Sequence, residues 1–251
     1  MKMQHLFLVS LALLLLVSCG KKGPVRPFQE KLPAAVTTAK LLQRGADFQL
    51  QWKMPKKNQD GSRLTDLDTL NVERLFSSEG EFCAECPDPW PIIARVHPDL
   101  PAPAQSVGDL FLLRDSGARV GQMARYRLQA NNRIGDTGLP RIIKQRFREP
   151  VAAPAGLSII THDKSIELHW QPSPVPAGAR LIGYQIYRRD ETESFLPVAT
   201  NLRPIEKINF EDYGLQNSRT YYYRVRTLFD FEGEFLESMP SIVVSARPTA
   251  G

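Results

Sequence analysis

Two short stretches decide the fold of this chain: Phe48-Gln49-Leu50-Gln51-Trp52 and Ile166-Glu167-Leu168-His169-Trp170. In each stretch apolar and polar residues alternate strictly, which is typical of a β-strand with one buried face. Each is followed closely by proline, at Pro55 and at Pro172. Because proline cannot donate to the hydrogen-bond ladder of a sheet, both strands are expected to end there.

The two stretches belong to an internal duplication, because matching segments follow them in the same order. The pairs are Leu70–Val72 with Tyr184–Ile186, Arg74 with Arg188, and Tyr126–Ala130 with Tyr221–Val225. Turn residues (Pro, Gly, Asn and Asp) separate these segments in both copies. Strands with one buried face need a second sheet to cover that face, so each copy is predicted to be an antiparallel β-sandwich.

Both copies resemble fibronectin type III domains. In the second copy the matching residues are Pro154, Leu157, Trp170, Tyr184, Ile186, Asp212, Gly214, Leu215, Tyr221, Gly233, Ser238 and Pro240. In the first copy they are Pro33, Val36, Trp52, Leu70, Val72, Tyr126, Gly135 and Pro140. The resemblance implies an all-β chain of two tandem sandwiches, at residues 33–149 and 150–249. It places the structural core at Trp52, Tyr126, Trp170, Tyr184, Leu215 and Tyr221.

The spacing from Leu215 to Tyr221 resembles a tyrosine corner, in which a tyrosine hydroxyl bonds to the backbone just upstream. Val120 and Tyr126 have the same separation in the first copy. The segment between the copies, Arg148–Pro154, is short and contains two prolines. It predicts a stiff, end-to-end arrangement of the two domains.

The N-terminal residues 1–18 are typical of an export signal. Lys2 precedes an apolar run from Leu6 to Val17, interrupted only by Ser10. This run is too short for a membrane-spanning helix with its own flanks. The residues Leu16-Val17-Ser18-Cys19 resemble the lipobox of bacterial lipoproteins. The resemblance implies cleavage before Cys19 and acylation of this new N-terminal cysteine by fatty acids such as palmitate. The alternative is an ordinary secretory signal. Several acyl chains on one cysteine give lasting membrane attachment.

Residues 19–32 are predicted to form a basic Gly/Pro tether. By the sorting rule of lipoproteins, Gly20 after the cysteine implies the outer membrane. The segment Cys19-Gly20-Lys21-Lys22-Gly23-Pro24, with Pro27 following, is similar to the start of the small outer-membrane lipoproteins that assist the lipopolysaccharide translocon. That likeness makes Lys22, Gly23 and Pro24 candidate partner-binding residues, whereas the alternative is a tether without binding.

The charge of the chain does not indicate a nucleic-acid partner. The sequence has 32 Lys and Arg against 27 Asp and Glu, a net charge of +5. Removal of the signal leaves about +4, and these charges are interspersed along the chain. Nucleic-acid binding domains concentrate a larger positive surplus on one face.

The first copy carries an insert at residues 79–91, which includes Cys83, Cys86 and Trp90. A pair of cysteines in an exported protein favours a disulfide, here a local staple of the loop. Haem attachment would need His after Cys86, where Pro87 stands, and zinc would need further ligands beyond His97. A redox dithiol is the remaining alternative. Trp90 is either a contact residue on the surface or a cover for the sandwich end.

The sequence contains no Gly-x-Ser-x-Gly elbow, no histidine-rich metal spacing and no Gly-rich phosphate loop. No catalytic residue, metal or cofactor is therefore predicted. We expect a non-enzymatic lipoprotein of the bacterial outer membrane that binds envelope proteins or polysaccharide, with its domains in the periplasm or on the cell surface. The alternative is an accessory spacer or binding subunit of a secreted carbohydrate-active or proteolytic enzyme.

Overall fold

The computed structural model describes residues 31–78 and 90–250, and the described chain is all β. No helix in these ranges is long and apolar enough to cross a membrane. The strands of the first half are β1 (Ala39–Arg44), β2 (Asp47–Lys53), β3 (Leu67–Ser77), β4 (Ile92–Val96), β5 (Gln105–Val107), β6 (Leu110–Asp115), β7 (Met123–Asn132) and β8 (Arg141–Arg146). Those of the second half are β9 (Ala155–His162), β10 (Ser165–Gln171), β11 (Arg180–Asp190), β12 (Asn209–Tyr213), β13 (Tyr221–Phe231), β14 (Glu234–Glu237) and β15 (Val244–Ala246).

The first sandwich packs the sheet β4-β3-β7-β8 against the strands β1, β2, β6 and β5. Alternation in β2 puts Phe48 and Trp52 into the space between the sheets, and both are fully buried. The Trp52 indole stacks on Phe111, with 5.9 Å between the ring centroids. Such aromatic pairs bury large apolar areas and therefore dominate the stability of a small core.

The second sandwich packs the sheet β12-β10-β9 against β11, β13 and β15. Here β10 repeats the alternation of β2, and Ile166, Leu168 and Trp170 are buried. Trp170 meets Tyr184 of β11 edge to face, with 5.2 Å between the ring centroids. Both halves are thus fibronectin type III-like β-sandwiches, as the repeated strand pattern predicts.

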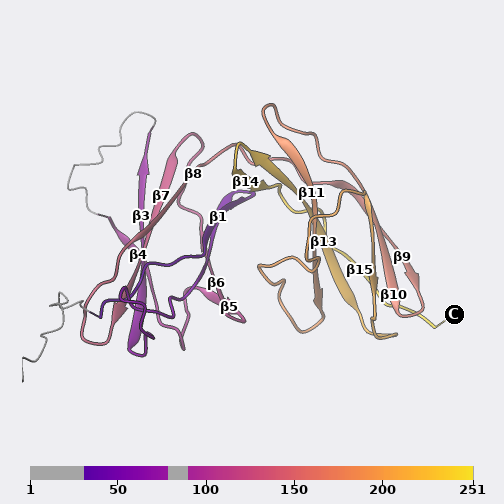
Figure 1. Cartoon of the computed structure of the whole chain (residues 1–251). Coiled ribbons are helices and arrows are strands. Elements are labelled where there is room, and N and C mark those ends of the chain that lie inside the picture. Colours follow the sequence, from indigo (N-terminus) through magenta and orange to yellow (C-terminus); the bar gives the residue numbers. More distant parts are fainter. Residues whose placement is uncertain (1–30, 79–89, 251) are drawn as a thin grey trace, which may run out of the picture.

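The two sandwiches share one sheet. Strand β1 of the first pairs in parallel with β14 of the second, with Leu42 opposite Phe235 and Arg44 opposite Glu237. This pairing creates an eight-stranded sheet in the order β11-β13-β14-β1-β2-β6-β5, with β15 also on β13 (Figure 1). The backbone hydrogen bonds of each domain therefore continue into the other.

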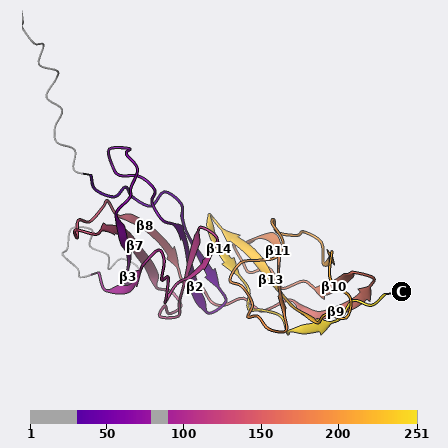
Figure 2. The same cartoon turned by 90° about the horizontal axis from the view of Figure 1, so that it is seen from below.

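The end-to-end arrangement that the linker predicts is wrong. Strands that pair must lie side by side, so the β1–β14 contact joins the domains laterally. In Figure 1 strands β3 and β7 of the first sandwich run steeply across the line that joins the two domains, and so do β9 and β10 of the second. Figure 2, seen from below, shows the same two units with β14 between β2 and β13.

The predicted match between Tyr126 and Tyr221 is also wrong, by two residues. Tyr126 lies opposite Arg74 on β3, whereas the residue opposite the equivalent Arg188 on β11 is Tyr223. Tyr126 therefore corresponds to Tyr223. The tyrosine corner exists in the second domain, where the Gln216 N–H donates to the Tyr221 hydroxyl at 3.1 Å. The first domain has none at the predicted place, since Val120 is exposed and Tyr126 donates to a carboxylate.

Candidate binding site at the domain junction

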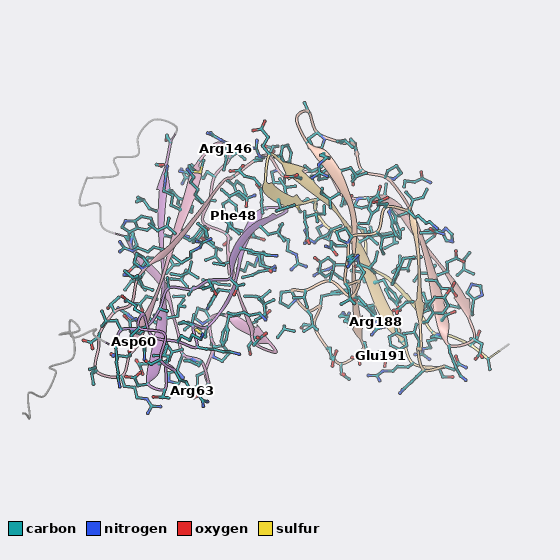
Figure 3. The ribbon with its side chains drawn as sticks, in the orientation of Figure 1. Phe48, Asp60, Arg63, Arg146, Arg188 and Glu191 are labelled. Carbon is teal, nitrogen blue, oxygen red and sulfur yellow. The ribbon has the colours of Figure 1, made fainter. Side chains whose placement is uncertain are left out.

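Each sandwich contains the same buried polar group of an arginine, an aspartate and a tyrosine. In the first, the Tyr126 hydroxyl donates to Asp115 at 2.6 Å and Arg74 pairs with the same carboxylate. In the second, Tyr223 donates to Asp212 at 2.8 Å, and Arg188 pairs with the same carboxylate at 2.8 Å. Figure 3 labels Arg188 in the second sandwich. Burial first, and then the adjacent carboxylate, raises the pKa of both tyrosines far above the ordinary value. Both hydroxyls therefore remain donors.

The turn from β1 to β2 rests on the second domain. Gly45 has a φ of +60°, and its N–H donates to the Glu237 carbonyl at 2.8 Å. A Cβ at this position would lie 2.8 Å from the Met239 sulfur. The left-handed backbone therefore favours glycine here, and an added Cβ would also force the flexible Met239 side chain of the neighbouring domain to shift.

Gln43 fastens the linker to the junction. Its side chain is fully buried, donates to the Arg148 carbonyl at 2.7 Å and accepts from the Arg148 N–H at 2.8 Å. Arg148 in turn pairs with Glu234 of β14 at 2.9 Å and lies over the Phe231 ring. Arg148 of the linker thus contacts Gln43 of the first domain and Glu234 and Phe231 of the second. These contacts hold the domains in one relative orientation.

A third group of arginine, carboxylate and tyrosine lies at the junction itself. Glu237, which is 3% exposed, accepts from the Tyr187 hydroxyl at 2.6 Å. Arg44 of the first domain approaches it at 3.0 Å from Nε, and Arg226 of β13 at 3.8 Å. Within the described part of the chain neither arginine Nε has a hydrogen-bond partner, so these are ion pairs without hydrogen bonds. Burial, and then the charge of Arg44, lowers the pKa of Arg226 to about 10.

The junction cluster borders a cavity of about 520 Å³ between the two domains. Both domains supply its walls, and its basic lining comes from Arg44, Arg114, Arg224 and Arg226. The apolar lining includes Phe195, Pro197 and Pro240. Arg44 also donates to the Pro197 carbonyl at 2.9 Å, and Gln49 to the same oxygen at 3.1 Å. The loop after β11 is thereby fixed to the first domain.

The structure places the predicted core residues inside the sandwiches. Trp52, Tyr126, Trp170, Tyr184, Leu215 and Tyr221 are all buried. Trp90 is half-buried, and Arg127 of β7 lies over its ring at 4.8 Å. Cys19, Lys22, Gly23, Pro24, Cys83 and Cys86 lie outside the described residues. In the described ranges no three His, Cys, Asp or Glu side chains are grouped as metal ligands.

Sequence reasoning missed the junction residues, although two signals point to them. Gln43 shares a strand face with Leu41, and a polar residue on a buried face usually has a specific partner. Arg224 and Arg226 alternate with the buried Tyr223 and Val225, which places both arginines on the other face of β13. Neither signal shows that this face meets the first domain.

No family model matches the chain. A stretch of 132 residues is 26% identical to titin of Drosophila melanogaster; it covers 49% of this chain and 1% of titin. Among solved structures, the FN1–FN3 domains of chicken CNTN1 share 15% identity, with a TM-score of 0.34 over 87% of this chain and 68% of that chain. The fold assignment therefore stands on the strand order described above.

Proposed function

We propose that this protein is a lipid-anchored lipoprotein of the bacterial outer membrane that acts by binding and holding, not by turnover. Acylated Cys19 would attach it, residues 19–32 would form the tether, and the paired sandwiches would recognise other envelope proteins or polysaccharide. Many cell-surface domains share the sandwich architecture, which is compatible with a binding or structural role.

The observation that carries this proposal is the shared sheet. Two domains on a flexible linker move independently, as is the default for tandem domains. Here the β1–β14 pairing and the Gln43–Arg148 contacts join them into one body. A rigid pair suits a protein that holds a partner in a set position above a membrane.

The partner can be identified by photo-crosslinking in intact cells. A photoreactive amino acid at exposed Ile134 in the first domain, or at exposed Leu202 in the second, is expected to capture discrete envelope partners. The same chains with Cys19→Ala serve as the control and should lose these adducts, because binding depends on anchoring. Capture of only a secreted hydrolase would favour an accessory enzyme subunit and contradict the proposal.

Anchoring has a separate test. Cys19→Ala is expected to release the protein from the membrane fraction, because the acylated thiol is lost. The double variant Cys83→Ser, Cys86→Ser should stay with the outer membrane, since these thiols are assigned to a local staple. A Cys19→Ala protein that still sediments with the outer membrane would refute the lipobox assignment.

The basic segment beside the lipid has its own test. Replacement of Lys22, Gly23 and Pro24, with Cys19 intact, should reduce partner capture if this segment is a contact surface. Unchanged capture would show that it is only a tether.

Thiol labelling with and without reductant tests the staple: a reactive pair of free thiols in Cys83 and Cys86 would contradict it.

A further inference from the structure

The junction cavity carries more positive than negative charge. Arg44 and Arg226 share the buried carboxylate of Glu237, and a third guanidinium, that of Arg224, lines the same cavity without an ion pair among the described residues. The side chains of Arg44 and Arg226 are each only 10% exposed. Buried charges in proteins are normally balanced, because removal from water strongly disfavours an isolated ion. A surplus at this position therefore requires an explanation.

Arg224 is the least satisfied of the three. Its Nε is buried without a hydrogen-bond partner, and no ion pair joins it to a described residue. The guanidinium lies 4.2 Å over the Phe195 ring and 5.5 Å from the Tyr187 ring. Burial, and then the charge of Arg44, lowers the pKa of Arg224. The two rings thus contact a cation that has no ion-pair partner in residues 31–78 and 90–250.

Neighbouring carboxylates do not remove this surplus. Asp47, which also lines the cavity, pairs with Arg114 at 2.8 Å. Glu193 lines an adjoining hollow but is exposed and forms no ion pair among the described residues. Arg189 lies over Tyr222 at 3.9 Å and 5.4 Å from the Phe195 ring, which adds further positive charge nearby. The local field therefore favours an anion.

Charge and size together select the ligand. The surplus of two positive charges matches a dianion, and a guanidinium presents paired donors that suit the oxygens of a phosphate. The cavity, at about 520 Å³, has the size of small-molecule sites and is far larger than inorganic phosphate needs. Phe195, Pro197 and Pro240 add an apolar wall against which a ring can pack.

We propose that the cleft between the two sandwiches binds a phosphate monoester carried on a small ring-containing body, with Arg224 as its main contact. Arg44 and Arg226 supply the field that favours the dianion, while Phe195 and the prolines contact the ring. This site does not depend on the lipid anchor, so its failure and that of the anchoring proposal are distinguishable.

Calorimetric titration of the purified full-length protein tests the site, with glucose 1-phosphate as the probe. We expect saturable binding that weakens as salt is raised, because the contact is electrostatic. Glucose should not bind, and inorganic phosphate should bind at least ten-fold more weakly. Absence of glucose 1-phosphate binding, or equal binding of glucose or inorganic phosphate, would overturn the proposal.

Variants assign the contact. Arg224→Gln should weaken binding at least ten-fold, and Arg224→Lys should restore part of it, because lysine keeps the charge but not the paired donors. The matched control is Arg180→Gln. Arg180 of β11 pairs with Asp230 of β13 outside the cavity, so this substitution should change the affinity less than two-fold. Unchanged affinity in Arg224→Gln would overturn the proposal.

A folding readout separates binding from structure. No hydrogen-bond acceptor for Arg224 lies among the described residues, so Arg224→Gln should have a urea midpoint close to that of the unmodified chain. Without ligand, removal of this half-buried cation relieves its repulsion with Arg44, which offsets the loss of its contacts with the Phe195 and Tyr187 rings. A clearly lower midpoint would show that Arg224 is a structural residue and would overturn its assignment as a ligand contact.

Discussion

The buried polar groups inside the sandwiches and the one between them have the same composition but a different charge balance. Within each sandwich one arginine meets one aspartate, which a tyrosine hydroxyl also contacts: Arg74, Asp115 and Tyr126 in the first, for example. At the junction Glu237 and Tyr187 repeat this chemistry, but two arginines approach the carboxylate and Arg224 stands nearby.

The difference separates building a domain from joining two. A balanced group satisfies its charges within one domain, so it can rigidify the core of that domain. The junction group takes Arg44 from one domain and Glu237, Tyr187 and Arg226 from the other. It therefore forms only when the two domains are docked. Its excess positive charge favours an anionic ligand.

The largest effect is expected from Glu237→Gln. Among the residues that the structure describes, Glu237 is the one carboxylate that Arg44 and Arg226 share, so the change leaves two buried cations unbalanced. Loss of one partner of a buried ion pair costs about 3–5 kcal/mol of unfolding free energy. Urea denaturation should show this loss, and limited proteolysis should show faster cleavage of the linker. Glu191→Gln, in an exposed pair with Arg247, is the control and should change little.

Asp115→Asn and Asp212→Asn should each cost less, about 2–3 kcal/mol, because a charged hydrogen bond is lost while the amide keeps an acceptor oxygen. Each change acts within one sandwich. Near-ultraviolet circular dichroism should register loss of packing around Tyr126 in the first variant and around Tyr223 in the second. Equal disturbance of both domains by either variant would contradict the comparison.

Gly45→Ala is expected to cost about 2 kcal/mol, from the left-handed backbone and the contact with Met239. Gly108→Ala is a matched control, since Gly108 has the same φ of +60° but nothing within 4 Å of an added Cβ. It should cost about 1 kcal/mol from the backbone alone. Urea denaturation gives the loss of unfolding free energy in each variant, and the extra loss in Gly45→Ala is the contribution of the junction. Equal losses in the two variants would show that the turn does not press on the second domain.

The smallest effect is expected from Lys53→Gln. Lys53 and Asp109 form an ion pair at 2.9 Å, but their side chains are 47% and 56% exposed. Exposed pairs of this kind contribute less than about 1 kcal/mol and are screened by salt. The urea midpoint should therefore move little. If Lys53→Gln lost as much unfolding free energy as Glu237→Gln, burial of the ion pairs would not explain the order of the predicted effects.

The strands were predictable because their signals are local. Alternation in residues 48–52 and 166–170 places Trp52 and Trp170 inside, and the structure confirms the sandwich fold. The junction was not predictable in this way, since β1 and β14 are far apart in sequence. Nothing within either strand states which other strand it pairs with.

The register error between the copies also has a physical source. Tyr221, Tyr222 and Tyr223 follow one another, and alternation places both Tyr221 and Tyr223 inside, so two matches to Tyr126 satisfy the same pattern. The aspartates decide between them: Asp115 precedes Tyr126 by 11 residues, as Asp212 precedes Tyr223. A polar partner at constant spacing was the better guide than the tyrosine run.

The pairing of β1 with β14 has a consequence for the order in which the molecule is completed. A chain emerges from its N-terminus, so β1 is present long before β14 exists. Until β14 arrives, the unpaired backbone groups of Leu42, Gln43 and Arg44 form an open sheet edge, which is a template for unwanted strand addition. The C-terminal domain therefore also protects the N-terminal domain, and a chain truncated before Glu234 would expose an aggregation-prone edge.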